Sequence, residues 1–421
     1  MPKHLDRYPD IIVLRDVSWI AGICVLFNPI GSLIAGVLMD HFGRVTTMKL
    51  ATFLCSLSWL VIASTNNIYC LYGAFIVFGI SIGMTPTCVV YVAEICSDKR
   101  RCVLLSVFII FYSTGVMFTY VITYFLHWRT SAWIFMTVST AICLSLFLLH
   151  EPPQWFVKSW NREKAIRVFQ ITRQITEVDA EKEYEKAAEN LHKYVHEKTS
   201  FKHIMNSWKP LVIAMVFQLL VQFSGCTMLV ACSSSLFGKI KMSFDQDTMG
   251  LTYSLAIFIS SFFSPFAALF GSRKKIVTIS SSFIVGTLLV LMVSLHYELT
   301  LLMQICLYGY VFFNVVGTIT VVESLPSEIF RLQVRGVMCG IIQAYSTVMQ
   351  GIIIKVFPDY LAATSVTCVL VTFLVFSIFL VFFGIFILPE TKGKTLEQIQ
   401  EEYFDEKPPK LETEKCCYIN P

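Results

Sequence analysis

Six charged residues lie at the ends of long apolar stretches, with spacings that suit ion pairs. They are Asp40, Arg44, Glu94, Arg101, Glu328 and Arg335. In two of the three segments concerned, the acid precedes the base by the same seven residues. Carboxylates and guanidinium groups form strong charge-assisted hydrogen bonds with each other. The chemistry that these residues offer is therefore the making and breaking of ion pairs.

The rest of the chain is unusually poor in charge. Of its 421 residues, 55% are hydrophobic and only 15% are charged, with a mean hydropathy of +0.66. A soluble domain has about 25% charged residues. Neither residues 17–39 nor residues 50–93 contain a charged side chain. Because about 20 apolar residues cross a bilayer, the sequence predicts an all-α integral membrane protein.

The sequence indicates no catalytic or cofactor chemistry. The fourteen cysteines show no metal-ligand spacing and no disulfide framework. No Ser/His/Asp arrangement and no phosphate-binding loop is evident, so we expect neither an enzyme, nor a cofactor, nor a nucleic-acid partner. The expected partners are a lipid bilayer and a small-molecule solute, and the oligomeric state stays open.

We predict eleven membrane spans. Their ranges are 17–39, 50–64, 68–93, 103–126, 130–149, 210–237, 249–271, 276–295, 300–322, 337–356 and 361–388. Lys and Arg are concentrated in alternate connecting segments, including the long polar loop 150–209 and the tail 389–421. Since cytoplasmic loops are enriched in these residues, both segments are expected in the cytoplasm. This loop contains a stretch, 177–198, whose Glu, Lys and Ala content predicts short surface helices.

Three features of the first half recur in the second half in the same order. Arg44 corresponds to Arg273, Glu94 to Glu328, and Glu151 to Glu390; these pairs lie 229, 234 and 239 residues apart. Three matches at nearly one offset predict two homologous halves in parallel orientation. A transporter built in this way has its site between the halves. The predicted domains are an N-terminal bundle (1–149), a linker (150–209), a C-terminal bundle (210–388) and a tail (389–421).

In this register the second half has six spans and the first has five, so the span before residue 17 would be missing. We therefore expect either that the sequence is a truncated version of a twelve-span protein, or that an eleven-span protein transports poorly. An in-frame upstream segment coding for about 20 apolar residues would favour truncation.

These motifs resemble the major facilitator superfamily, sugar-porter branch. Gly36, Asp40, Gly43 and Arg44 match the family's motif after its second helix, and the family's Pro-Glu-Thr-Lys-Gly-Lys-Thr-Leu is intact at 389–396. Other segments (127–132, 223–226 and 352–359) are most similar to the insect facilitated trehalose transporters. The resemblance implies a two-bundle fold that moves a small polar solute, most often a sugar, by alternating access. It implies a multi-pass protein of the plasma membrane.

The resemblance also assigns roles to residues. The implied cytoplasmic gate consists of Asp40, Gly43, Arg44, Glu94, Arg101, Glu151, Glu328, Arg335 and Glu390. These charges can pair across the bundles when the cytoplasmic side is closed; alternatively, they only satisfy membrane topology. The implied substrate-binding residues are Gln222, Ser224, Thr227, Glu323 and Ser346.

Most of the family's sugar-facing groups are nevertheless replaced. Ile109 stands where the family has a Gln, and Glu323 stands where it has a Trp. An acid at this depth is costly and indicates a proton carrier or a ligand for a cation, although it could also pair with a gate base. Three functions therefore stay open: a sugar transporter, a transporter of another solute, including a cationic one, with proton coupling, and a non-transporting sensor or binding protein.

The predicted topology can be tested with one cysteine. A cysteine introduced at Ser200 should be protected from an impermeant thiol reagent applied to intact cells, because loop 150–209 is expected in the cytoplasm. The reagent should reach it after permeabilisation. Labelling of intact cells above the level of the unmodified protein would show that the orientation is reversed.

Overall fold

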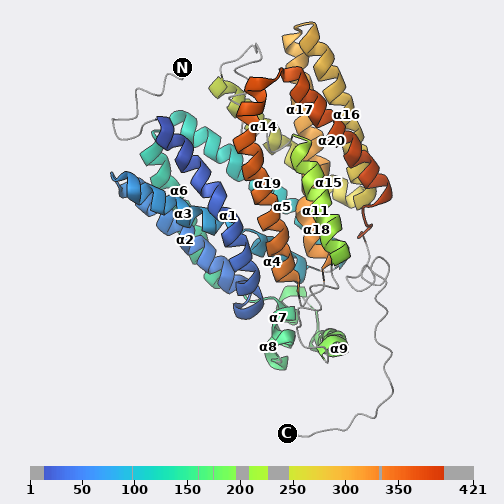
Figure 1. Cartoon of the computed structure of the whole chain (residues 1–421). Coiled ribbons are helices and arrows are strands. Elements are labelled where there is room, and N and C mark those ends of the chain that lie inside the picture. Colours follow the sequence, from blue (N-terminus) through green and yellow to red (C-terminus); the bar gives the residue numbers. More distant parts are fainter. Residues whose placement is uncertain are drawn as a thin grey trace.

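The computed structural model shows a protein built of helices, most of them long and apolar (Figure 1). It describes residues 14–96, 98–159, 161–173, 175–195, 208–225, 246–330 and 334–392. Within these ranges there is no β-strand. Helices are expected here because each backbone N–H and C=O group in a lipid environment needs a partner within its own segment.

The first half of the chain forms five membrane-spanning segments. Its elements are α1 (Leu14–Phe42), α2 (Arg44–Ser64), α3 (Ile68–Gly83), α4 (Pro86–Ile95), α5 (Asp98–Phe125), α6 (Trp128–Ser145) and the short 3-10 helix η2 (Leu146–Leu148). Helices α3 and α4 make one span with a turn just before Pro86, where the proline lacks an N–H donor. Within this half α1 packs on α3, and α2 packs on α6.

Three short helices connect the halves: α7 (Pro153–Lys158), α8 (Arg162–Arg173) and α9 (Glu177–Val195). They lie together beyond one end of the bundle (Figure 1), which we call the linker end. Val157, Ala165, Phe169 and Ala180 form their small shared core. Where short surface helices are expected at 177–198, the described residues form one helix, α9, up to Val195.

The second half repeats the plan. Its elements are α11 (Trp208–Phe223), α14 (Gln246–Ser261), α15 (Phe263–Phe270), α16 (Arg273–His296), α17 (Thr300–Phe313), the π-helix η3 (Asn314–Ile319), α18 (Thr320–Ile329), α19 (Arg335–Ala363) and α20 (Val366–Phe386). The described residues contain ten helical segments long and apolar enough to span a membrane, and α11 is a shorter apolar helix. The remainder of the predicted span 210–237 lies mostly outside the described residues.

The helices extend further over charged residues than the hydropathy pattern predicts. The spans expected at 17–39 and 50–64 are α1 and α2, and only Gly43 separates them. Gly43 has φ of +100°, a conformation that favours glycine, and this lets the chain reverse at once. The α18 helix likewise runs on to Ile329 instead of ending near residue 322. One reason is that Arg44 and Glu328 at these ends are buried and paired, so the helices can include them.

The two halves meet along several helix pairs, of which α1 with α19 and α5 with α14 are prominent (Figure 1). Glycines allow α1 and α19 to approach closely. A Cβ atom at Gly340 would lie 2.6 Å from the Ser32 carbonyl oxygen and 3.2 Å from the Gly36 Cα atom. Small residues at such crossings are typical of membrane helices, because backbones must come close for good packing.

A glycine-to-alanine pair tests this crossing. Gly340→Ala should destabilise the protein by about 1–3 kcal/mol, because the added methyl group meets backbone atoms that cannot move aside. Gly286→Ala is the matched control, since a Cβ at Gly286 meets nothing within 4 Å. Thermal unfolding of the purified proteins should show a lower Tm for the first variant only. Equal Tm values would contradict close packing of α1 on α19.

Candidate functional site

A buried cluster of charges lies at the linker end of the first half. The Arg44 guanidinium donates through Nε and Nη2 to the two Glu94 oxygens, at 2.9 and 3.0 Å. It also donates to the Met39 carbonyl oxygen at 2.7 Å, and lies 3.5 Å from Asp40. Arg44 and Glu94 are each only 1% exposed. Such a bidentate pair is favourable when buried because several hydrogen bonds offset the cost of desolvation.

Glu151 binds the same cluster through the backbone. Its carboxylate accepts the N–H groups of Arg44 (2.7 Å), Val45 (3.1 Å) and Thr46 (2.9 Å). These are the first N–H groups of α2, which have no partner within the helix, and the helix dipole favours a negative charge there. A Cβ at Gly43 would lie 2.6 Å from this carboxylate, so a glycine is needed at the turn.

The second half contains the corresponding cluster. Arg273 donates to Glu328 at 2.7 Å, and the backbone N–H groups of Arg273 and Lys274 donate to Glu390 at 3.1 and 3.3 Å. Thr391 adds a hydrogen bond to the other Glu328 oxygen at 2.6 Å. The pairs Arg44/Arg273, Glu94/Glu328 and Glu151/Glu390 thus make the same type of contact in both halves.

An ion pair joins the cluster of the first half to α19 of the second half. Arg335, at the start of α19, has its Nη1 atom 3.6 Å from a Glu94 oxygen, and both side chains are fully buried. Arg335 Nε also donates to the Phe330 carbonyl oxygen at 3.3 Å. The repeat would pair Arg101 with Glu328 in the same way, but the Arg101 side chain lies outside the described part of the structure. In this structure, therefore, an ion pair connects the halves at the linker end.

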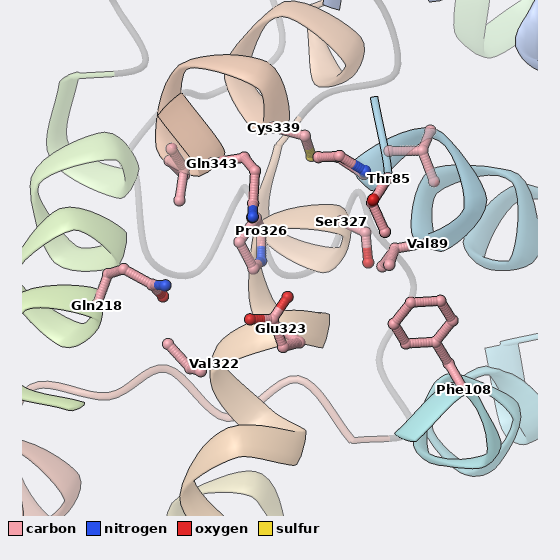
Figure 2. A pocket seen from close by; sticks show the side chains of 13 residues that line it. Thr85, Val89, Phe108, Gln218, Val322, Glu323, Pro326, Ser327, Cys339 and Gln343 are labelled. Atoms are coloured by element: carbon pink, nitrogen blue, oxygen red, sulfur yellow. The ribbon is translucent and has the colours of Figure 1, made fainter. Parts of the chain in front are cut away.

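A cavity of about 40 Å³ lies between the halves, farther from the linker end (Figure 2). Its polar lining comes from the turn before α4 and from α11, α18 and α19. The polar residues are Thr85, Gln218, Glu323, Ser327 and Gln343. Phe108 of α5 and Val89 of α4 form an apolar wall on the side opposite Gln218 (Figure 2). The volume suffices for a few water molecules, so this state holds a contracted cavity.

The structure brings together only part of the predicted binding set. Glu323 faces the cavity, while Gln222 and Ser346 lie beside it and bond to each other at 3.1 Å. Ser224 is buried at the end of α11, where its hydroxyl donates to the Val221 carbonyl oxygen at 2.8 Å and does not reach the cavity. Thr227 lies outside the described residues.

Sequence reasoning missed several of the polar groups. Gln218 lies one helical turn before Gln222 and donates to the same Ser346 hydroxyl, so the spacing of four residues was a usable signal. Gln343 is three residues before Ser346 on α19, and it lines the cavity with Thr85 and Ser327. The sequence of an apolar stretch does not show whether a polar residue such as Gln343 lines a cavity or makes a hydrogen bond within the core.

Two parallel helical halves, matching charge clusters at one end and a polar cavity between the halves define a two-bundle membrane transporter of the major facilitator type. The comparison with known structures agrees. The proton:xylose symporter XylE, bound to 6-bromo-6-deoxy-D-glucose, superposes with a TM-score of 0.80 at 19% sequence identity, over 93% of this chain and 91% of that one.

Sequence comparison gives the family. The family described as "Sugar (and other) transporter" matches residues 13–403. A facilitated trehalose transporter of Bombyx mori is 24% identical over 409 residues, covering 92% of this chain and 79% of the relative. A glucose transporter of Staphylococcus epidermidis is 23% identical over 400 residues, covering 90% of this chain and 88% of the relative. The chain belongs to the sugar transporter family.

The ion pair between the halves leads to a prediction. Arg335→Ala should leave the first half folded, because Glu94 retains both hydrogen bonds from Arg44. It should shift the equilibrium toward a state open at the linker end by about 1–3 kcal/mol, since the ion pair with Glu94 across the halves is lost. Distances between spin labels introduced at His41 and Lys275, which are exposed at this end of each half, report the shift.

Arg129→Ala serves as the control, because Arg129 pairs with Asn66 at the opposite end of the first half. A distance distribution that is the same in the Arg335 and Arg129 variants would mean that the charges at the linker end serve membrane topology alone.

Proposed function

We propose that the protein carries a sugar across the membrane by alternating access, and that the cavity between the halves is its binding site. The observation that supports this best is the set of amides and hydroxyls from both halves around one cavity. Such groups can donate and accept hydrogen bonds with sugar hydroxyls, while the Phe108 ring offers an apolar face. Since both halves contribute, relative motion of the halves would form and dissolve the site.

In this proposal the charge clusters form a gate. The bundles 1–149 and 210–388 move as two bodies, joined by the linker 150–209, and 389–421 forms the tail. With Glu94 and Arg335 paired, the linker end is closed, and opening it separates them. Within each half the Arg44–Glu94 and Arg273–Glu328 pairs persist in both states, so each half moves as a unit. Glu151 and Glu390 hold the helix ends in place.

We place the linker end, and with it the C-terminal tail, in the cytoplasm, and we place the protein in the plasma membrane. The concentration of Lys and Arg in loop 150–209 and in the other segments at this end supports the orientation. The linker end is thus the cytoplasmic gate, and this structure corresponds to the state in which that gate is closed.

For the substrate we propose a hexose or trehalose. The support comes from the similarity over most of the chain to relatives named as trehalose and glucose transporters. The groups that bind the sugar would be Gln218, Gln343 and Glu323, with Gln222 and Ser346 behind them. Of the other two residues predicted from sequence, Ser224 bonds to the Val221 carbonyl oxygen in this state, and Thr227 lies outside the described residues.

Uptake into vesicles tests the function. Proteoliposomes with the purified protein should exchange labelled glucose or trehalose faster than empty vesicles do. Gln343→Ala should lower the initial rate at low sugar concentration by about threefold to tenfold, the loss expected for one hydrogen bond. Gln350→Ala, on the same helix but not in the cavity lining, is the matched control.

Equal rates for the Gln343 and Gln350 variants would place the site elsewhere. If the protein exchanges none of a panel of labelled sugars, although it binds one of them, a sensor or binding protein becomes the better account.

A further inference from the structure

One acidic side chain faces the cavity without any basic partner. Among the described residues, Glu323 makes no ion pair and no hydrogen bond, and the cavity lining contains no Lys, Arg or His. Its carboxylate lies in the cavity, with Gln218 on one side and Phe108 on the other (Figure 2). This contrasts with Glu94 and Glu328, which are each bound by an arginine.

We propose that Glu323 carries a proton that is transported together with the solute. This rests on the proposed function, because a coupled proton needs a transported solute. The step involves no electron transfer. A Glu323 oxygen takes one proton from water at the open side and forms an O–H bond; when the other side opens, that bond breaks and the proton passes to water there.

The physical argument concerns the closing of the cavity. An isolated charge in the interior of a membrane protein is costly, and the cost rises as water leaves. With about 40 Å³, the contracted cavity has no room for a sugar or for a solute bearing an ammonium group. A proton is the neutralising cation that this space accepts most easily. The halves can therefore close over Glu323 in its neutral form at much lower cost than in its ionised form.

The surroundings leave Glu323 as the group that changes charge. Of the other residues that line the cavity, only Cys339 has a titratable side chain. Neighbouring helices contribute Glu94 and Arg335, but these pair with each other at the linker end. Tyr91 of α4 donates to the His150 carbonyl oxygen at 3.1 Å, away from the cavity lining. Lys209 lies at the first turn of α11 and does not line the cavity.

The local backbone favours an adjustable position for this carboxyl. The π-helix η3 directly precedes α18, and Pro326 follows Glu323 by three residues. Pro326 cannot donate to the Val322 carbonyl oxygen, which removes one helical hydrogen bond next to Glu323. Interruptions of this kind are frequent at functional sites in helices. Glu323 thus lies between two interruptions of the helical hydrogen-bond pattern.

The experiment uses the full chain in proteoliposomes with a trapped pH-sensitive dye. Uptake of labelled glucose and trehalose is measured with and without an inward proton gradient of one pH unit. For each sugar, uptake with the gradient is divided by uptake without it, which gives the uptake ratio. For one proton per sugar, the gradient supports about tenfold accumulation, because one pH unit corresponds to about 1.36 kcal/mol. Wild type should show accumulation approaching this value, and the trapped dye should report acidification of the vesicle lumen on sugar addition.

Variants at two glutamates sharpen the test. Glu323→Gln should give a ratio of about one, whatever its absolute rate, and Glu323→Asp should restore a ratio above one. Glu298→Gln is the matched control, because Glu298 is exposed in the turn between α16 and α17; its ratio should equal that of wild type. Equal ratios in wild type and Glu323→Gln overturn the proposal. So does accumulation driven by a sodium gradient at equal pH.

A second measurement does not depend on sugar transport. Infrared difference spectra between acidic and alkaline buffer should contain a carboxyl band from Glu323 in wild type and in Glu298→Gln, and this band should be missing in Glu323→Gln. If no sugar is transported but the band is present, the proposed function fails while the proton site stands. If the band is unchanged by Glu323→Gln, the proton site fails. Binding of glucosamine that requires the Glu323 carboxylate at every pH would instead assign this residue to a cationic solute.

Discussion

The structure depends on one buried carboxylate that two arginines share. Glu94 accepts two hydrogen bonds from Arg44 in its own half and lies 3.6 Å from Arg335 of the other half. A buried acid that lost its only partner would cost about 3–5 kcal/mol. In the proposed cycle Arg44 stays with Glu94 when Arg335 leaves, so separating the halves would avoid most of that cost. On this proposal the linker end can close tightly and still open.

The same constraint explains why the helix ends are so compact. Glu151 and Glu390 each occupy the N-terminus of a helix, α2 and α16, and accept its free N–H groups. Each helix end thus receives a carboxylate from a segment distant in the chain. This ties the start of α2 to the segment that enters the linker, and the start of α16 to the segment that follows α20. The repeat is visible in sequence because both halves need the same charges at the same places.

Much of this arrangement could be predicted from the sequence, and the reason is physical. Charge is so rare in this chain that each Arg or Glu at the end of an apolar stretch carries information, and Arg44, Glu94 and Glu151 recur as Arg273, Glu328 and Glu390. The exact ends of the helices could not be predicted, because hydropathy places a charge outside a span whether or not it is paired. Asp40 and Arg44 lie within α1 and α2 for that reason.

The cavity was much harder to predict. Gln and Ser in an apolar helix face the protein interior, but the sequence does not say what they contact there. Gln222 and Ser346 were expected to bind the solute, and in this state they bond to each other. Gln343, which lines the cavity, is only three residues before Ser346 on the same helix. A rotation of a helix by part of a turn exchanges these roles, and such a rotation follows from packing of all the helices together.

The two acids of α18 show how one helix can combine a fixed charge with a variable one. Glu328 is enclosed by Arg273 and Thr391, so its charge is compensated in every state that keeps this half intact. Glu323 lies five residues earlier, about 7.5 Å along the axis, and no described base accompanies it. The first acid joins structural elements of one half, while the second lies where the two halves meet. The energy of a charge that is compensated within one half does not depend on whether the cavity is open. The energy of a charge at the junction of the halves does depend on it. In the proposed mechanism, the protonation of Glu323 and the position of the two halves influence each other, since the open and the closed cavity stabilise different forms of the carboxyl group.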